Sequence, residues 1–268
     1  MALARVNGIT LSYDQYGSGE TVVLVTGTGA PGRTWKTHQV PALRAAGYRV
    51  VTMDNRGIAP TDCGTGQFTI EDMAADVAGL IEFLDAGPCR VVGFSLGGII
   101  VQELLVTRPE LVRKAVLIGA AARVDGLIRG VVEAELDLVD SAVKLPPRYA
   151  AVVTALQNLS PRTLDDPNLL RDWLDILEFS AVDPASIRRQ LTVQLIADRR
   201  ERNAKIDCPC LVIGFADDLV VRPHLCRELA GSIPGATYRE LADCGHYGSL
   251  ERPEAVNSLL VEYFATAG

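Results

Sequence analysis

Apolar and polar positions alternate in two ways along this chain. Short, nearly continuous apolar runs are separated by longer stretches in which apolar residues recur every third or fourth position. The short runs are typical of strands buried on both faces, and the longer period is typical of amphipathic helices. Together they predict a mostly parallel sheet with helices on both faces. The expected strands, of which the last is less apolar, are residues 21–26, 48–54, 90–94, 114–118, 210–215 and 237–241.

The N-terminal segment has a different pattern. Two strand-like pieces, residues 5–6 and 9–11, flank the dipeptide Asn7-Gly8. Asn-Gly between two such pieces is a strong signal for a two-residue hairpin turn. We therefore expect an antiparallel hairpin to begin the sheet, which brings the number of strands to eight.

Helices are expected between several of these strands. Thr69 and Asp72 have the spacing of a helix N-terminal capping pair, and Pro109 follows a helical pattern as a stop signal. The predicted helices cover residues 34–46, 69–84, 96–107, 223–230 and 253–264.

The alternation of strands and helices is interrupted between residues 123 and 205. This block contains amphipathic stretches such as VVEAELDLVDSAV and LLRDWLDILEFS, separated by several prolines. Such a pattern favours a set of short helices inserted into the sheet domain. We predict a helical cap, or lid, domain over residues 123–205, and a core domain made of residues 1–122 and 206–268.

Composition narrows the class of protein. The chain has 268 residues, and 48% of them are hydrophobic, which is enough for a sizeable packed core. A net charge of -7 gives no general attraction to nucleic acid or to an anionic membrane. The first residues lack the basic flank and apolar run of a secretory signal, and no stretch reaches the roughly 20 apolar residues of a membrane span. We therefore expect a cytoplasmic protein with no nucleic-acid or membrane partner.

The six cysteines do not have the pattern of a disulfide framework or a metal site. Cys208 and Cys210 are separated only by Pro209, which is not the two-residue spacing of zinc or redox pairs. Cys244 is notable because it lies two positions before a histidine, although a small buried side chain is its simpler interpretation. We expect neither a metal nor a cofactor.

One motif carries recognisable chemistry. In the sequence VVGFSLGG, Ser95 stands between Gly93 and Gly97, directly after a predicted strand and directly before a predicted helix. This is the G-x-S-x-G nucleophile elbow, in which a strained turn presents a serine hydroxyl above the sheet and the glycines avoid collisions. The amides at the start of the helix can stabilise an oxyanion. The alternatives are an ordinary tight turn and a phosphate-binding turn.

A serine nucleophile needs a base, and the chain has three histidines. His38 and His224 lie in predicted helical patterns, where surface or capping positions are expected. His246 lies in a loop between the last predicted strand and the last predicted helix, which is the position of the base in the chain order serine, acid, histidine. We predict that His246 is the base.

The acid that orients this histidine should follow the strand before the last one. The segment LVIGFADDLVVRP offers Asp217 and Asp218 at that point. We favour Asp218, because the residues after it have the expected turn pattern. Asp125, which follows the preceding strand, is a third candidate.

These motifs resemble those of the α/β-hydrolase superfamily, particularly its esterase, cofactor-free haloperoxidase and carbon-carbon hydrolase branch. The resemblance covers nearly the whole chain outside the helical block. It implies an α/β-hydrolase fold without a cofactor, a triad of Ser95, Asp218 and His246, and an oxyanion hole formed by the backbone amides of Thr28 and Leu96. The segments that carry it are VVLVTGTGAPGRTW, VPALRAAGYRVVTMDNRG, VVGFSLGG, LVIGFADD and GHYGSLERPE.

Two departures from the family pattern bear on the site. The family usually has His-Gly after the third strand, whereas this chain has Thr26-Gly27, so a histidine that commonly supports the oxyanion loop is missing. The run Ile58-Ala59-Pro60-Thr61 replaces a segment that is often rich in glycine and ends in serine. Both changes concern the surroundings of the triad and not its members.

The resemblance leaves the reaction open between three hypotheses. The first is a hydrolase for esters or thioesters of small to medium apolar acyl groups, with the helical block enclosing the substrate. The second is cleavage of a carbon-carbon bond, or perhydrolysis of the haloperoxidase kind, with the same triad. The third is a ligand-binding protein that retains the triad and turns over slowly. The abundance of arginine over lysine is typical of a GC-rich genome and makes a role in secondary metabolism conceivable.

Overall fold

A computed structural model describes residues 1–141, 143–179 and 184–266 of the chain. Its centre is an eight-stranded sheet with the strand order β1-β2-β4-β3-β5-β6-β7-β8. The first two strands pair antiparallel to each other, and β2 pairs antiparallel to β4, whereas the remaining neighbours are parallel. The mostly parallel eight-stranded sheet predicted from the sequence is therefore confirmed. The strands are β1 (Ala2–Val6), β2 (Ile9–Tyr16), β3 (Thr21–Val25), β4 (Arg49–Met53), β5 (Cys89–Phe94), β6 (Val112–Ile118), β7 (Cys210–Phe215) and β8 (Thr237–Leu241).

The predicted hairpin joins β1 to β2. Val6 pairs with Ile9, and the two turn residues between them have positive φ angles, 45° at Asn7 and 76° at Gly8. Asparagine and glycine tolerate this left-handed backbone better than other residues, which is why the dipeptide closes the turn.

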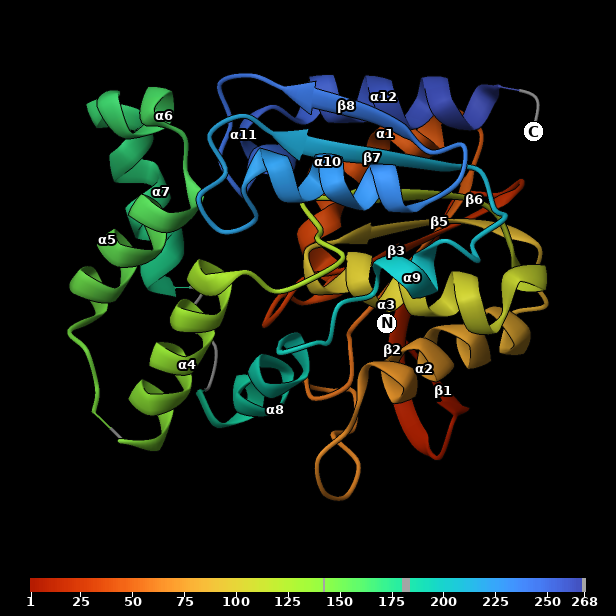
Figure 1. The fold of residues 1–268 in the computed structure, drawn as a ribbon, viewed down its shortest axis with the longest axis horizontal. Helices are drawn as coiled ribbons and strands as arrows, with labels where there is room; N and C mark the ends of the chain where they lie inside the picture. Colours follow the sequence, from red (N-terminus) through yellow and green to blue (C-terminus); the bar gives the residue numbers. More distant parts are fainter. Residues whose placement is uncertain (142, 180–183, 267–268) are drawn as a thin grey trace.

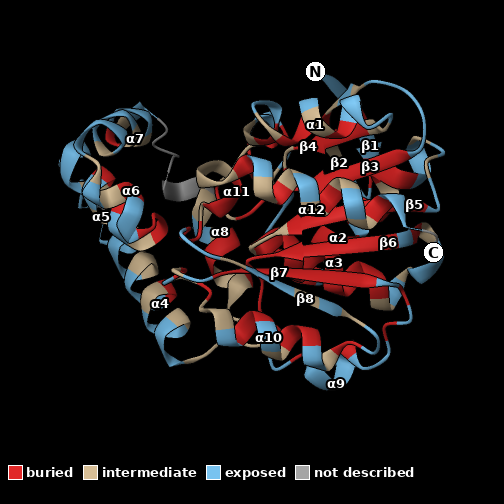
Figure 2. Cartoon of the chain, turned by 90° about the horizontal axis from the view of Figure 1, so that it is seen from above, coloured by how far each residue is buried: buried red, intermediate tan, exposed pale blue. Residues whose placement is uncertain are grey.

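The sheet separates two hydrophobic cores, and successive residues of each parallel strand point into opposite ones. On β3, for example, Val23 belongs to the core beneath α2, α3 and α10, and Val22 belongs to the core beneath α1 and α12. Buried residues are accordingly concentrated on the strands and on the inner faces of these helices (Figure 2). The helices are α1 (Gln39–Ala45), α2 (Ile70–Phe83), α3 (Leu96–Thr107), α10 (Pro223–Ser232) and α12 (Pro253–Ala265).

Four of the five helices predicted for the core are confirmed, including the capping box of Thr69 and Asp72 on α2. The prediction of one continuous helix over residues 34–46 was wrong. The structure has a short 3-10 helix at Gly32–Lys36, followed by the separate helix α1. Pro41 lies in the first turn of α1, and its ring would collide with the carbonyl of residue 37 if the helix continued backwards. A four-residue helix, α11 (Gly248–Glu251), was not predicted.

Among the described residues between β6 and β7, where the sequence pattern departs from strand-helix alternation, the structure has six helices. Figure 1 shows α4 to α7 beyond the carboxyl ends of β7 and β8. Four of the six helices begin with proline, a residue whose missing N–H is harmless at a helix start. The helices are α4 (Gly126–Asp140), α5 (Pro147–Asn158), α6 (Pro161–Asp165), α7 (Pro167–Phe179), α8 (Pro184–Gln194) and α9 (Arg200–Asn203).

Two of these helices carry the amphipathic segments noted in the sequence, which fall on α4 and α7. Residues 142 and 180–183 of the predicted cap, and 267–268 of the predicted core domain, lie outside the described residues. α5 and α7 share a small hydrophobic cluster of their own, formed by Ala151, Ala155, Leu159 and Leu174. Across the described ranges, none of the helices has both the length and the apolar character needed to cross a bilayer.

Candidate active site

Ser95 occupies the tight turn between β5 and α3 with φ 53° and ψ -118°. This conformation is strained for a residue with a side chain. The flanking glycines make the turn possible, because a Cβ on Gly93 would lie 2.4 Å from the carbonyl oxygen of Gly97, and a Cβ on Gly97 would lie 2.3 Å from that of Val25. The elbow that the motif predicted is therefore built from close contacts between backbone atoms.

The structure brings Ser95, His246 and Asp218 together in one hydrogen-bonded line. The imidazole Nε2 of His246 lies 3.0 Å from the Ser95 hydroxyl oxygen, and its Nδ1 lies 2.7 Å from Oδ2 of Asp218. His246 is 5% exposed and Asp218 is 1% exposed, whereas Ser95 is only half-buried. The acid and the base are therefore shielded from water, and the hydroxyl remains open to a ligand. Such an arrangement can transfer the hydroxyl proton to the imidazole.

The carboxylate of Asp218 is fixed by the turn in which it lies. Its second oxygen, Oδ1, accepts hydrogen bonds from the backbone amides of Val220 and Val221, at 2.8 and 2.7 Å. Because both bonds hold Oδ1, Oδ2 is the oxygen that faces the imidazole.

The other two candidate acids lie elsewhere. The backbone amide of the half-buried Asp217 donates a hydrogen bond to the carbonyl of Cys244. Burial raises the pKa of the Asp217 side chain, and so do the nearby carboxylates of Asp243 and Glu251. Asp125 caps α4 through the amide of Ile128, at 2.9 Å, and forms an ion pair with Arg222. The structure thus brings Asp218, and neither Asp217 nor Asp125, to the imidazole.

The remaining candidate side chains have ordinary positions. His38 stands at the N-terminal end of α1, and His224 is exposed on α10. Cys244 is fully buried, and burial raises the pKa of its thiol to about 12, which keeps it an inert, protonated group.

Two residues that the sequence interpretation did not single out hold the histidine loop. The ring of Phe94 packs against the imidazole, with 4.9 Å between the ring centres. Glu251 accepts a hydrogen bond from the backbone amide of Gly245, at 2.7 Å, through Oε2. Through Oε1 it accepts from the hydroxyls of Ser160 and Thr163 at the start of α6, at 2.7 and 2.6 Å. No local pattern in the sequence indicates these contacts of Glu251.

The loop after β3, residues 26–30, lies against Ser95. A Cβ on Gly27 would lie 3.1 Å from Cβ of Ser95. The backbone amides of Thr28 and Leu96 have no hydrogen-bond acceptor among the described residues. Both are therefore available to a bound group.

Other side chains hold this loop although the usual histidine is missing. The hydroxyl of Thr26 donates to the carbonyl of Ala30 at 2.8 Å, which closes the loop on itself. The side-chain amide of Asn55 donates to the Thr26 carbonyl, also at 2.8 Å. The substitution of histidine by threonine at position 26 thus leaves the loop with its own hydrogen bonds.

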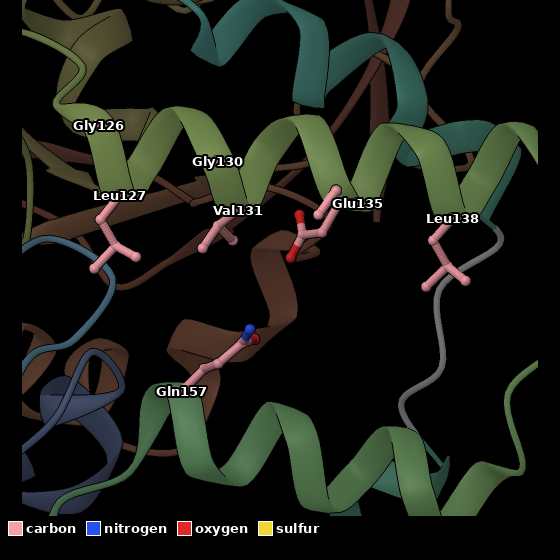
Figure 3. Close-up of a pocket in the computed structure, with 8 residues that line it drawn as sticks. Gly126, Leu127, Gly130, Val131, Glu135, Leu138 and Gln157 are labelled. Atoms are coloured by element: carbon pink, nitrogen blue, oxygen red, sulfur yellow. The ribbon is translucent and has the colours of Figure 1, made fainter.

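A cavity of about 340 Å³ lies between α4 and α5. Its walls are mostly apolar, and Figure 3 shows the side chains of Glu135 and Gln157 extending toward each other across it. Burial raises the pKa of the Glu135 carboxyl. Gln157 precedes Asn158, whose carbonyl accepts the backbone amide of Tyr247 at 3.0 Å, so this end of the cavity adjoins the His246 loop. The residues around the cavity are Gly126, Leu127, Gly130, Val131, Ala134, Glu135, Leu138 and Gln157.

A second cavity, of about 520 Å³, lies between α5 and α6 on one side and the loop after β7 on the other. Asp218 and Leu159 are among the residues that line it. Ser95 lines neither of these two cavities, as far as the described residues go.

Comparison with known proteins shows the family to which the chain is related. The sequence model of the alpha/beta hydrolase family matches residues 22–259. A Mycobacterium tuberculosis protein named as a non-heme bromoperoxidase, BpoC, is 46% identical over 96% of this chain and 98% of its own length. The crystal structure of BpoC gives a TM-score of 0.92 at 45% identity, with 95% of each chain covered.

Two further relatives carry other names. A Serratia proteamaculans protein named as a carbamate hydrolase, RutD, is 30% identical over 90% of this chain and 89% of its own. The structure of an enol-lactonase from Burkholderia xenovorans gives a TM-score of 0.86 at 27% identity, covering 99% of this chain and 100% of that one. Similar chains on the same fold are thus named for different reactions.

Proposed function

The chain belongs to the alpha/beta hydrolase family, and we propose that it is a serine hydrolase that cleaves an ester or thioester of a small to medium apolar acyl group. One observation carries this proposal: the unbroken line of hydrogen bonds from Asp218 through His246 to the hydroxyl of Ser95. A serine with this partner and this burial is activated as a nucleophile.

The proposed reaction has two halves. Ser95 Oγ attacks the carbonyl carbon while His246 Nε2 takes the hydroxyl proton, and Asp218 stabilises the imidazolium that forms. The negative oxygen is held by the amides of Thr28 and Leu96, the second of which lies at the N-terminus of α3. His246 then protonates the leaving alcohol or thiol. Water, deprotonated by the same imidazole, releases the acid and restores the serine hydroxyl.

We assign residues 123–205 to a cap that encloses the substrate. Two features support this assignment: the separate hydrophobic cluster of α5 and α7, and the apolar cavity between α4 and α5 beside the His246 loop. The walls of this open cavity, which do not include Ser95, suit an aliphatic or aromatic acyl group better than a charged one.

Labelling with a fluorophosphonate probe tests the mechanism, because the probe forms a covalent bond only with an activated serine. We expect the wild-type protein to be labelled, Ser95→Ala to be unlabelled, and His246→Ala to react at least about 100-fold more slowly. Ser141→Ala, at an exposed serine after α4, is the matched control and should label normally. Undiminished labelling of Ser95→Ala would refute the proposal.

Turnover on p-nitrophenyl esters and acyl thioesters is a second test. A single stoichiometric burst without turnover on these substrates would also refute the proposal and would favour a ligand-binding protein.

A second activity is supported by the 46% identity with BpoC over nearly the full chain. In perhydrolysis, hydrogen peroxide replaces water in the second half of the reaction, so that the acyl-serine yields a peroxy acid and the free hydroxyl. The same triad serves both reactions. Bromination of a dye in the presence of acetate, peroxide and bromide measures the peroxy acid. Loss of that signal in Ser95→Ala is expected, and its persistence would exclude this route.

A further inference from the structure

Gln190 is a fully buried polar residue on α8, with 0% of its surface exposed. Its side-chain amide makes two hydrogen bonds to backbone groups far away in the sequence. Oε1 accepts from the N–H of Gly29 at 2.8 Å, and Nε2 donates to the carbonyl of Arg56 at 2.8 Å. One side chain of the helical block therefore joins two loops of the sheet domain.

The first of these loops contains the proposed oxyanion amide. Gly29 directly follows Thr28, and its φ of 68° is in the left-handed region that favours glycine. In this turn the peptide joining Thr28 to Gly29 directs its N–H toward Gln190. The orientation of that peptide and the orientation of the Thr28 amide are linked, because only two backbone torsions at Thr28 separate them.

The second loop gives Gln190 a rigid support. The guanidinium of Arg56 is paired with the buried carboxylate of Asp76 through two hydrogen bonds, of 2.6 and 2.8 Å. The next residue along α8, Leu191, is 2% exposed, and Arg189 donates to the carbonyl of Gly64. The end of α8 is thus packed against the loop that follows β4, and the Gln190 amide has little freedom to turn.

We propose that Gln190 is a positioning residue, which holds the loop at residues 26–30 so that the Thr28 amide points at the oxyanion. The inference rests on the function proposed above, since it concerns the same loop. In this chain, a residue from the helical block takes part of the supporting role that the missing histidine has in related sequences.

The experiment compares Gln190→Met and Gln190→Glu with the wild-type protein. Methionine has nearly the same length but can make neither bond. The glutamate side chain reproduces both bonds only when it is protonated, because its C=O then accepts from Gly29 and its O–H donates to Arg56. Thr192→Ala, two residues along α8, is the matched control, since its hydroxyl bonds only within the helix. Steady-state kinetics on a p-nitrophenyl ester between pH 6 and 8 are recorded for all four proteins.

We expect Gln190→Met to lower kcat by about 10- to 100-fold with KM changed less than threefold, since the oxyanion exists only in the transition state. Gln190→Glu should retain more activity than Gln190→Met, and its kcat relative to wild type should rise as the pH falls. An unchanged kcat in Gln190→Met, a change in KM alone, or a Gln190→Glu variant no better than Gln190→Met at any pH would overturn the proposal.

Amide hydrogen exchange of Gly29, followed by NMR, provides a second readout that needs no turnover. We expect Gln190→Met to speed this exchange and Thr192→Ala to leave it unchanged, and equal exchange in all proteins would refute the positioning role. If Ser95→Ala remained active, the proposed function would fail, whereas the exchange measurement would still decide whether Gln190 holds the loop.

Discussion

Replacing Asp218 with asparagine should inactivate the protein through the tautomer of His246 and not through lost structure. Oδ1 of Asp218 already accepts two backbone amides, so the carbonyl oxygen of asparagine must take that place. The asparagine NH₂ group then faces Nδ1 of His246, which has to become the acceptor. The ring proton moves to Nε2 and points at the Ser95 hydroxyl, 3.0 Å away. In this tautomer the imidazole cannot accept the hydroxyl proton.

The expected loss in kcat is about 10³- to 10⁴-fold, or about 4 to 5 kcal/mol of transition-state stabilisation, by analogy with serine proteases in which the same exchange was made. KM should change little, because Asp218 is separated from the nucleophile by the imidazole. The assay is hydrolysis of a p-nitrophenyl ester at pH 8, with thermal unfolding to confirm that the variant is folded.

Asp217→Asn is the matched control, because it makes the same chemical change one residue earlier. In the described part of the chain its side chain makes no hydrogen bond to the imidazole, so kcat should remain within about threefold of wild type. If Asp217→Asn caused the larger loss, or if Asp218→Asn kept more than a tenth of the activity, the acid would be wrongly assigned.

Four further substitutions test the surroundings of the site. Gly93→Ala, whose Cβ would lie 2.4 Å from the Gly97 carbonyl oxygen, should lower the free energy of unfolding by about 3 kcal/mol, as measured by urea denaturation. Gly130→Ala, with no atom within 4 Å of the new carbon, should raise the free energy of unfolding by up to about 1 kcal/mol. Equal changes in the free energy of unfolding for the two glycine variants would contradict this packing argument. Glu251→Gln should lower the free energy of unfolding by about 2 kcal/mol and also lower kcat. Both carboxylate oxygens of Glu251 accept hydrogen bonds, and the NH₂ group of glutamine cannot accept one. An unchanged free energy of unfolding would contradict this. Glu135→Gln should raise Tm at pH 8 but not at pH 4. Burial raises the pKa of Glu135, so its charged form destabilises the fold above that pKa, and the penalty is absent below the ordinary value near 4.5. An equal change in Tm at both pH values would count against this.

Most of the sheet domain was predictable from the sequence because its determinants are local. Both faces of the parallel strands are covered, so each strand is a short apolar run that stands out from the helical stretches around it. The error over residues 34–46 has a local cause too, since Pro41 restricts where α1 can begin. The apolar pattern continues across that break and therefore predicts one helix where the backbone forms two.

Ser95 and His246 could be proposed from the sequence as nucleophile and base for a different reason. The G-x-S-x-G motif is contiguous, and the loop of His246 follows the last strand. The contacts of Phe94, Glu251 and Gln190 were not predicted, because each of these residues contacts a partner that is distant in the sequence. Gln190 reaches Gly29 across 161 residues, and no local pattern indicates such a pairing.

By itself, the sequence determined the order of strands and helices, the strained turn at Ser95 and the small set of residues able to serve as base and acid. Only the tertiary structure shows that it is Asp218 whose carboxylate is hydrogen-bonded to the imidazole of His246, and only it shows which side chains hold the loops around Ser95. The reason is physical. Hydrophobic periodicity and turn chemistry act between neighbours in the chain, whereas a hydrogen bond depends on distances of about 3 Å between atoms that only the packed fold brings together.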